Sequence, residues 1–96
     1  MDKLFDRLQM LADRYEELGE LLSDPDVIAD SKRFMELSKE MADLRETVEK
    51  YEKYKQVGQQ IKDDEEMLST GLDDEMAAMV KEELSDSKNE KQKLEQ

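Results

Sequence analysis

Apolar residues recur at steps of three and four along the first part of the chain. This spacing places them on one face of a helix, where they can pack against a partner helix. The positions in this seam are Leu4, Leu8, Leu11, Tyr15, Leu18 and Leu22, and the stripe is widened by Phe5, Ala12 and Leu21. The pattern predicts a helix over about residues 2–23. Ser23-Asp24-Pro25 ends it, because proline cannot continue the helical hydrogen-bond ladder.

Residues 24–30 are predicted to form a connector. Asp24 can cap one short turn, with Pro25 at the first helical position, where proline is tolerated. Asp30 is a suitable N-cap for the next helix, because its carboxylate can accept a hydrogen bond from a free backbone N–H. Val27 and Ile28 are expected to pack back onto the first helix.

The longest predicted element is a helix over residues 31–69. Its front half carries one apolar series, formed by Phe34, Leu37, Met41, Leu44, Val48 and Tyr51, and its back half carries another, formed by Tyr54, Val57, Ile61 and Leu68. Three successive steps of three join Val48 to Val57, and this break in the heptad rotates the apolar face around the helix. We therefore expect the first helix to pack on the front half and a third helix to pack on the back half.

A turn at Thr70-Gly71-Leu72-Asp73 leads into a third helix over about residues 74–95. Gly71 suits the left-handed position that ends a helix, and Asp73 suits the N-cap of the next helix. The apolar positions are Met76, Met79, Val80 and Leu84, after which only Leu94 follows. Because this seam fades, we interpret residues 1–96 as a single helical N-terminal domain cut from a longer protein.

These elements predict an all-α fold. The expected arrangement is an elongated antiparallel three-helix bundle, made of coiled-coil-like hairpins that share a long central helix. The composition agrees, since 36% apolar and 44% charged residues suit long helices with one buried stripe better than a thick core.

The net charge of −12 at pH 7 bears on the choice of partner. Such a surface repels phosphates, so we expect no direct nucleic-acid binding and favour a basic protein surface as partner. The charge also fits a simpler role, which is to keep exposed helices in solution. No apolar run approaches the roughly 20 residues needed to cross a bilayer, and the first residues lack a signal-peptide pattern, so we expect a cytoplasmic protein without membrane contact.

No catalytic, cofactor or metal site is predicted. Histidine and cysteine are absent, which removes the commonest general base and the commonest soft metal ligands. The connector acids fail the spacing of a calcium loop, because Ala29 and Met35 stand where an EF-hand needs glycine and glutamate.

Two further patterns receive structural interpretations. The acidic run 63–66 is interpreted as a solvated helix face, since consecutive helical residues fan around the axis and cannot converge on one ion. The methionines are interpreted as core filler rather than an adaptable binding groove. Those assigned to the seams are Met41, Met67, Met76 and Met79.

The connector also carries a resemblance to a known family. Asp24-Pro25-Asp26-Val27-Ile28-Ala29-Asp30, with residues 15–18, 21–23 and 32–40 around it, resembles the N-terminal domain of bacterial class I peptide chain release factors of the type that reads UAA and UAG. Residues 51–57 and the stretch 65–84 fit as well, so the resemblance covers essentially the whole chain.

The resemblance implies an accessory, non-catalytic interaction domain of a translation termination factor. In that family a tripeptide in a later domain reads the stop codon, and a Gly-Gly-Gln loop in another domain hydrolyses peptidyl-tRNA. Gly58-Gln59-Gln60 is not that loop, because it has one glycine and lies within a predicted helix. The implied partners are the ribosome near its GTPase-associated centre, the methyltransferase that modifies the catalytic glutamine, and the class II release factor.

The candidate partner-binding edge is formed by Pro25, Arg33 and Phe34, which combine a rigid turn, a charge and an aromatic anchor. The competing interpretation is that Phe34 begins the apolar seam and Arg33 is merely solvated. A second function class also fits the pattern, that of a free-standing acidic coiled-coil scaffold or adaptor, which would extend an unbroken heptad and self-associate.

Overall fold

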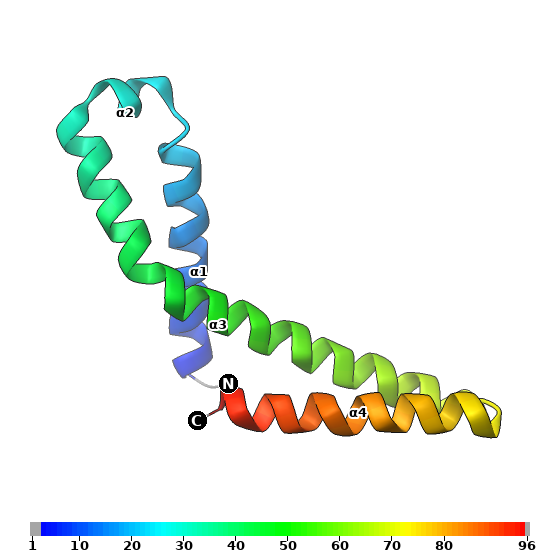
Figure 1. Ribbon diagram of the computed structural model, residues 1–96. Coiled ribbons are helices and arrows are strands. Elements are labelled where there is room, and N and C mark those ends of the chain that lie inside the picture. The colour runs from blue at the N-terminus through cyan, green and yellow to red at the C-terminus, as the bar shows by residue number, and fades with distance from the viewer. Residues whose placement is uncertain (1–2, 96) are drawn as a thin grey trace. The chain divides into compact units, whose positions relative to one another are not determined.

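The computed structural model describes residues 3–95, and their regular secondary structure is entirely helical (Figure 1). The helices are α1 (Lys3–Leu21), α2 (Pro25–Ala29), α3 (Ser31–Ser69) and α4 (Asp74–Leu94). The predicted all-α class is confirmed. The chain divides into two compact units, Met1–Glu52 and Lys53–Gln96, called here the first and second units. The helix α3 contributes its front half to the first and its back half to the second.

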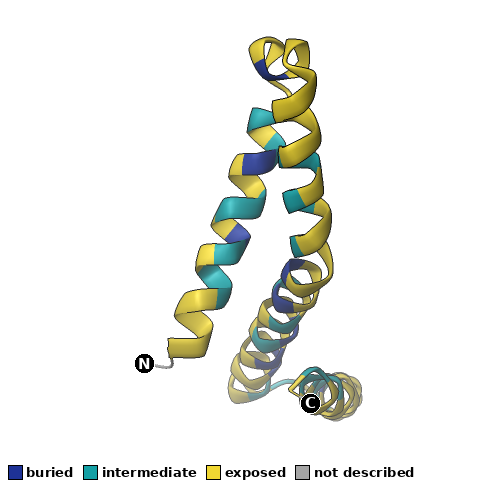
Figure 2. Ribbon diagram, turned by 90° about the vertical axis from the view of Figure 1, so that its left-hand side faces the viewer, coloured by how far each residue is buried: buried dark blue, intermediate teal, exposed yellow. Residues whose placement is uncertain are grey.

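In the first unit, α1 packs against the front half of α3. Ala12, Val48 and Tyr51 form the buried centre. Partly buried side chains surround it, namely Leu8, Leu11, Tyr15 and Leu44. Figure 2 shows buried and half-buried positions on the side of α1 that faces α3. The pairing predicted from the two seams is therefore observed.

Two packing predictions for the first unit are wrong, one for a seam residue and one for a connector residue. Leu4 is 58% exposed, because it lies in the first turn of α1, where a side chain has few neighbours. Ile28 is 54% exposed rather than packed on α1, because the five-residue α2 turns only one face inward and Val27, which is 1% exposed, occupies it. Ala12, expected only to widen the stripe, is buried at its centre.

The connector is held by the two predicted caps. The Asp24 carboxylate accepts a hydrogen bond from the Asp26 N–H at 2.9 Å, with Pro25 in the first turn of α2. The Asp30 carboxylate accepts one from the Arg33 N–H at 3.2 Å and so begins α3. Because each cap satisfies a backbone donor that the helix itself leaves free, the direction of the chain is fixed at both ends of α2.

In the second unit, α4 packs against the back half of α3. Val57, Ile61 and Val80 are buried between the helices. The turn is built as predicted: Gly71 has φ +80, which favours glycine, and the Asp73 carboxylate accepts a hydrogen bond from the Met76 N–H at 2.9 Å.

The methionines of the second unit do not fill its core. Met67, Met76 and Met79 are 41%, 48% and 68% exposed. The buried stripe of α4 instead runs through Ala77 and Val80, so the two methionines of α4 lie one residue to the side of it. The interpretation of these residues as core filler is therefore wrong. No helix among the described residues is long and apolar enough to cross a membrane.

Candidate interaction surfaces

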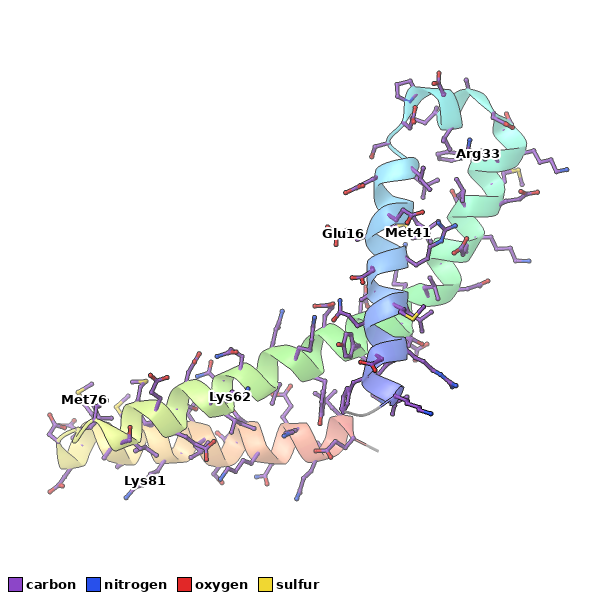
Figure 3. All side chains as sticks on the ribbon, turned by 180° about the vertical axis from the view of Figure 1, so that it is seen from behind. Glu16, Arg33, Met41, Lys62, Met76 and Lys81 are labelled. Carbon is purple, nitrogen blue, oxygen red and sulfur yellow. The ribbon has the colours of Figure 1, made fainter. Side chains whose placement is uncertain are left out.

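The structure places all three predicted partner-binding residues at the connector end of the first unit. Pro25 is exposed and begins α2, while Phe34 lies in the first turn of α3. Arg33, which is labelled in Figure 3, lies in the same turn of α3. Phe34 is 36% exposed, and its N–H donates to the Asp30 carbonyl at 2.8 Å. Phe34 is interpreted from the sequence either as an aromatic anchor for a partner or as the first residue of the apolar seam. Its position is compatible with both, since it begins the seam and still presents part of its ring to solvent.

Two further apolar side chains are exposed at the same end of the first unit. Ile28 is 54% exposed and Met35 is 71% exposed. Sequence analysis missed both as surface residues. For Met35 the signal was available, because it falls between the seam positions 34 and 37. We call Pro25, Ile28, Arg33, Phe34 and Met35 the connector surface.

An ion pair links α1 to α3 within the first unit. The Arg14 guanidinium binds both carboxylate oxygens of Glu40, with Nε to Oε2 at 2.6 Å and Nη2 to Oε1 at 2.9 Å, and its third nitrogen reaches Glu17 at 2.6 Å. The hydrogen bonds from Arg14 lower the pKa of Glu40, and the same contacts raise the pKa of Arg14. This two-point contact fixes the rotation of α1 relative to α3 more tightly than apolar packing alone.

Polar contacts of two tyrosines flank the apolar centre of the first unit. The Tyr51 hydroxyl donates to Gln9 Oε1 at 2.9 Å, and Arg45 Nε donates to the Tyr15 hydroxyl at 3.4 Å. Each ring is therefore packed while its oxygen reaches the edge of the helix pair, as expected for tyrosine at a seam. Together with the Arg14 ion pair, these hydrogen bonds hold α1 against α3 and so stabilise the unit that carries the connector surface.

The second unit contains a buried carboxylate that sequence analysis placed in solvent. Asp64 is only 1% exposed, so the interpretation of 63–66 as a uniformly solvated run is wrong at this position. The signal was present in the spacing: Val57, Ile61 and Leu68 leave one gap in the three-four pattern, and Asp64 fills it. A residue at that register points toward α4 whatever its polarity.

Asp64 belongs to a polar cluster between α3 and α4. The Gln60 amide nitrogen donates to Asp64 Oδ1 at 3.0 Å and also to Glu83 Oε1. Asp64 Oδ2 is buried and receives no hydrogen bond while Glu83 is ionised. The hydrogen bond and the negative charge of Asp64 raise the pKa of Glu83. The Asp64 carboxylate therefore favours the protonated form of the Glu83 carboxyl group.

Cross-helix contacts also set the register of α3 against α4. Lys53 pairs with Glu90 at 3.2 Å, and Gln60 bonds Glu83. A step of seven residues forward along α3 thus corresponds to a step of seven backward along α4, as in an antiparallel hairpin. Beside these contacts, the Lys91 ammonium lies 5.8 Å from the centre of the Tyr54 ring. This contact covers apolar surface where α4 has few apolar residues of its own.

The described residues hold no group of three or more acidic, histidine or cysteine side chains that could bind a metal ion. Asp64 and Glu83 are two carboxylates with one amide, fewer protein oxygens than a calcium site uses.

Comparison with known proteins places these helices in a family. The PCRF domain matches residues 11–96. Over its full length of 96 residues the chain is 83% identical to peptide chain release factor 1 of Ligilactobacillus salivarius, and it covers 27% of that protein. It is 64% identical over 95 residues to the factor of Lactiplantibacillus plantarum and 67% identical over 92 residues to that of Enterococcus faecalis, covering 26% of each.

The chain thus spans about a quarter of the length of these relatives. The matches to the last two relatives include 99% and 96% of the chain itself. The region that it matches is the N-terminal part of the relatives. No solved structure matches the chain. The resemblance seen in the connector is confirmed by these similarities, and the chain belongs to the PCRF domain family.

Proposed function

We propose that this chain is a non-catalytic interaction module of a bacterial translation termination factor. The observation that carries the proposal is the 83% identity to peptide chain release factor 1 across all 96 residues. Because the chain spans only about a quarter of that relative, the stop-codon reading at UAA and UAG and the hydrolysis of peptidyl-tRNA are assigned to segments outside residues 1–96. In this proposal the module acts in the cytoplasm, on the ribosome.

The proposed role of the module is to position the factor through protein contacts. Its net charge of −12 disfavours contact with ribosomal RNA phosphates and favours basic protein surfaces. We propose ribosomal proteins near the GTPase-associated centre as the main partners. The methyltransferase of the catalytic glutamine and the class II release factor are proposed as further partners.

The connector surface is the proposed contact site on the first unit. Pro25, Arg33 and Phe34 remain its central residues, now joined by Ile28 and Met35. Exposed apolar side chains grouped around a charge are typical of a protein interface rather than of a solvated helix end. Because polar contacts hold α1 and α3 together, the surface is ordered before a partner binds, and less conformational entropy is lost on binding.

A peptide-release assay on programmed ribosomes tests the proposal. A full-length factor that begins with this segment is compared with one from which residues 1–96 are removed, at UAA, UAG and UGA codons. We expect both to release peptide at UAA and UAG but not at UGA, with a higher KM and a similar kcat for the truncated factor. Loss of release by a folded truncated factor at saturating concentration would refute the accessory role.

Single substitutions in the full-length factor test the connector surface. Phe34→Ser and Arg33→Ala are expected to raise KM for release without changing kcat. Arg7→Ala, which removes another exposed arginine from the first unit, is the matched control and should leave both constants unchanged. If Arg7→Ala and Arg33→Ala have equal effects, the contribution of Arg33 is bulk charge and not a contact.

The scaffold alternative makes a different prediction for the isolated chain. A scaffold needs a free seam, but here α1 occupies the front seam of α3 and α4 covers the back seam. We therefore expect the chain to sediment as a monomer at micromolar concentration. A stable, concentration-independent dimer would favour the scaffold.

A further inference from the structure

The register of the second unit places three methionines on one side of the hairpin. The Lys53–Glu90 and Gln60–Glu83 contacts are separated by seven residues on each helix. Counting seven more residues toward the turn reaches Met67 on α3 and Met76 on α4. These two methionines therefore face each other on the same side of the hairpin as the two polar contacts. Met79 lies four residues before Glu83 and shares that side.

These three side chains are available to a partner. They are 41%, 48% and 68% exposed, in the order Met67, Met76 and Met79. Figure 3 shows Met76 beside the turn that ends the hairpin. Unbranched thioether side chains adapt their shape to different apolar partners, which is why methionine is common on surfaces that accept amphipathic helices. We call these three residues the methionine face.

The chain segments that carry the methionine face are strongly acidic. Between Lys62 and Lys81 the sequence has no lysine or arginine, and it has seven acidic residues: Asp63, Asp64, Glu65, Glu66, Asp73, Asp74 and Glu75. The cap acceptor Asp73 and the buried Asp64 are already used within the fold, which leaves the others exposed around the turn. An apolar partner with an acidic or neutral border would gain nothing from this field, whereas a basic border would be attracted.

We propose that the methionine face is a docking site for an amphipathic, lysine- or arginine-rich segment of another protein. Apolar side chains of that segment pack on Met67, Met76 and Met79, and its basic residues lie against the acids of the turn. The proposal deepens the proposed function by giving the second unit a partner chemistry of its own. It does not depend on the connector surface, which belongs to the first unit.

The test uses the intact chain and a synthetic amphipathic helix with leucines on one face and lysines on the other. Binding is followed by NMR of methyl-labelled methionines. We expect the methyl signals of Met67, Met76 and Met79 to shift in a saturable way, while that of Met10 stays unchanged. Met10 is 69% exposed, and the residues three and four positions from it along α1 are Asp6, Arg7, Asp13 and Arg14, whose charges cancel, so it is a matched control for exposure without a net acidic border.

Variants and control peptides make the result decisive. The triple substitution of Met67, Met76 and Met79 to glutamine should weaken binding at least about tenfold, as removal of central apolar anchors does, and Met10→Gln should not. Because the replaced side chains are exposed, unchanged helicity by circular dichroism confirms that the triple variant is folded. A peptide with glutamate in place of each lysine should not bind.

Three outcomes would overturn the proposal. Equal binding of polylysine, without methionine shifts, would show charge attraction alone. Equal binding of the glutamate peptide would show that the acidic border is irrelevant. Dimerisation of the chain through the methionine face, seen as methionine shifts on concentration without peptide, would make a second copy the occupant. None of these outcomes bears on whether the full-length factor terminates translation, which the release assay tests separately.

Discussion

Replacing Asp64 with asparagine tests the account of the buried polar cluster. The substitution keeps the shape of the side chain and removes its charge. The asparagine oxygen can still accept the hydrogen bond from Gln60, which is 3.0 Å long in the parent chain. Its Nδ2 takes the place of Oδ2, the buried oxygen that receives no hydrogen bond while Glu83 is ionised, and becomes a donor toward Glu83.

The expected gain in stability follows from the environment of Oδ2. A buried polar atom without a partner costs about 1–3 kcal/mol, and a charged one costs more. Asparagine removes this cost while it retains the Gln60 bond, so we expect the free energy of unfolding to rise by about 1–3 kcal/mol. In a chain of this size each kcal/mol corresponds to about 4–8 °C in Tm, so the change should be easily measured.

The effect should depend on pH in a defined direction. The pKa of Glu83 is raised above its ordinary value of 4.5, so the folded state holds its proton at pH values where the unfolded state has released it. The stability linked to this proton is fully present below pH 4.5 and is lost as the pH rises through the raised pKa. Without the Asp64 charge this loss should be smaller, since desolvation would then be the remaining cause that raises the pKa of Glu83, so the advantage of Asp64→Asn is largest at neutral pH and shrinks in acid.

Urea and thermal unfolding followed by circular dichroism between pH 4 and pH 8 provide the measurement. Glu65→Gln is the matched control, because it removes one negative charge from an exposed position next to Asp64 and should change stability by less than about 0.5 kcal/mol. If Asp64→Asn is neutral or destabilising at pH 7, Asp64 Oδ2 is satisfied in solution and the reasoning fails. Equal gains for both variants would refute it as well, since they would reflect net charge alone.

Other predictions concern the glycines and the ion pair of the first unit. Gly58→Ala should stabilise the chain by about 0.5–1 kcal/mol in urea unfolding, because Gly58 lies within α3 and an added Cβ meets no atom within 4 Å. Gly71→Ala should destabilise it by about 1 kcal/mol in the same assay, because its φ of +80 strains any residue with a Cβ. The pKa of Glu40 is lowered by Arg14, so the stability that this pair contributes is present above the ordinary carboxyl pKa of 4.5 and is lost as the pH falls through the lowered value. An Arg14→Ala, Glu40→Ala double-mutant cycle should therefore show a coupling energy at pH 7 that vanishes in strong acid, and a pH-independent coupling would contradict the assignment.

The backbone plan of the chain could be predicted from sequence because local signals determine it. The carboxylates of Asp24, Asp30 and Asp73 cap helices by accepting hydrogen bonds from N–H groups only two or three residues away. Gly71 adopts the positive φ that the turn before α4 requires. The break between Val48 and Val57 likewise separates the two seams of α3. Each of these features depends on spacing along one segment, which a sequence displays directly.

The environment of individual side chains was harder to predict, because it depends on the partner helix. Met76 and Met79 have helical spacing, but the face of α4 that meets α3 is centred on Ala77 and Val80 instead. Asp64 was assigned by its charge rather than by its register. The residues of the connector surface were identified by their chemical type, and their use by a partner is a proposal for experiment.

The continuity of α3 across the boundary between Glu52 and Lys53 has a consequence for how the chain folds. Starting a helix is costly, whereas extending one costs little per residue. A helix shared by two hairpins is started once, and whichever hairpin forms first supplies a ready template for the other. The two units should therefore unfold with positive cooperativity, so that a destabilising substitution in one lowers the hydrogen-exchange protection of the other, most strongly for amides close to the boundary.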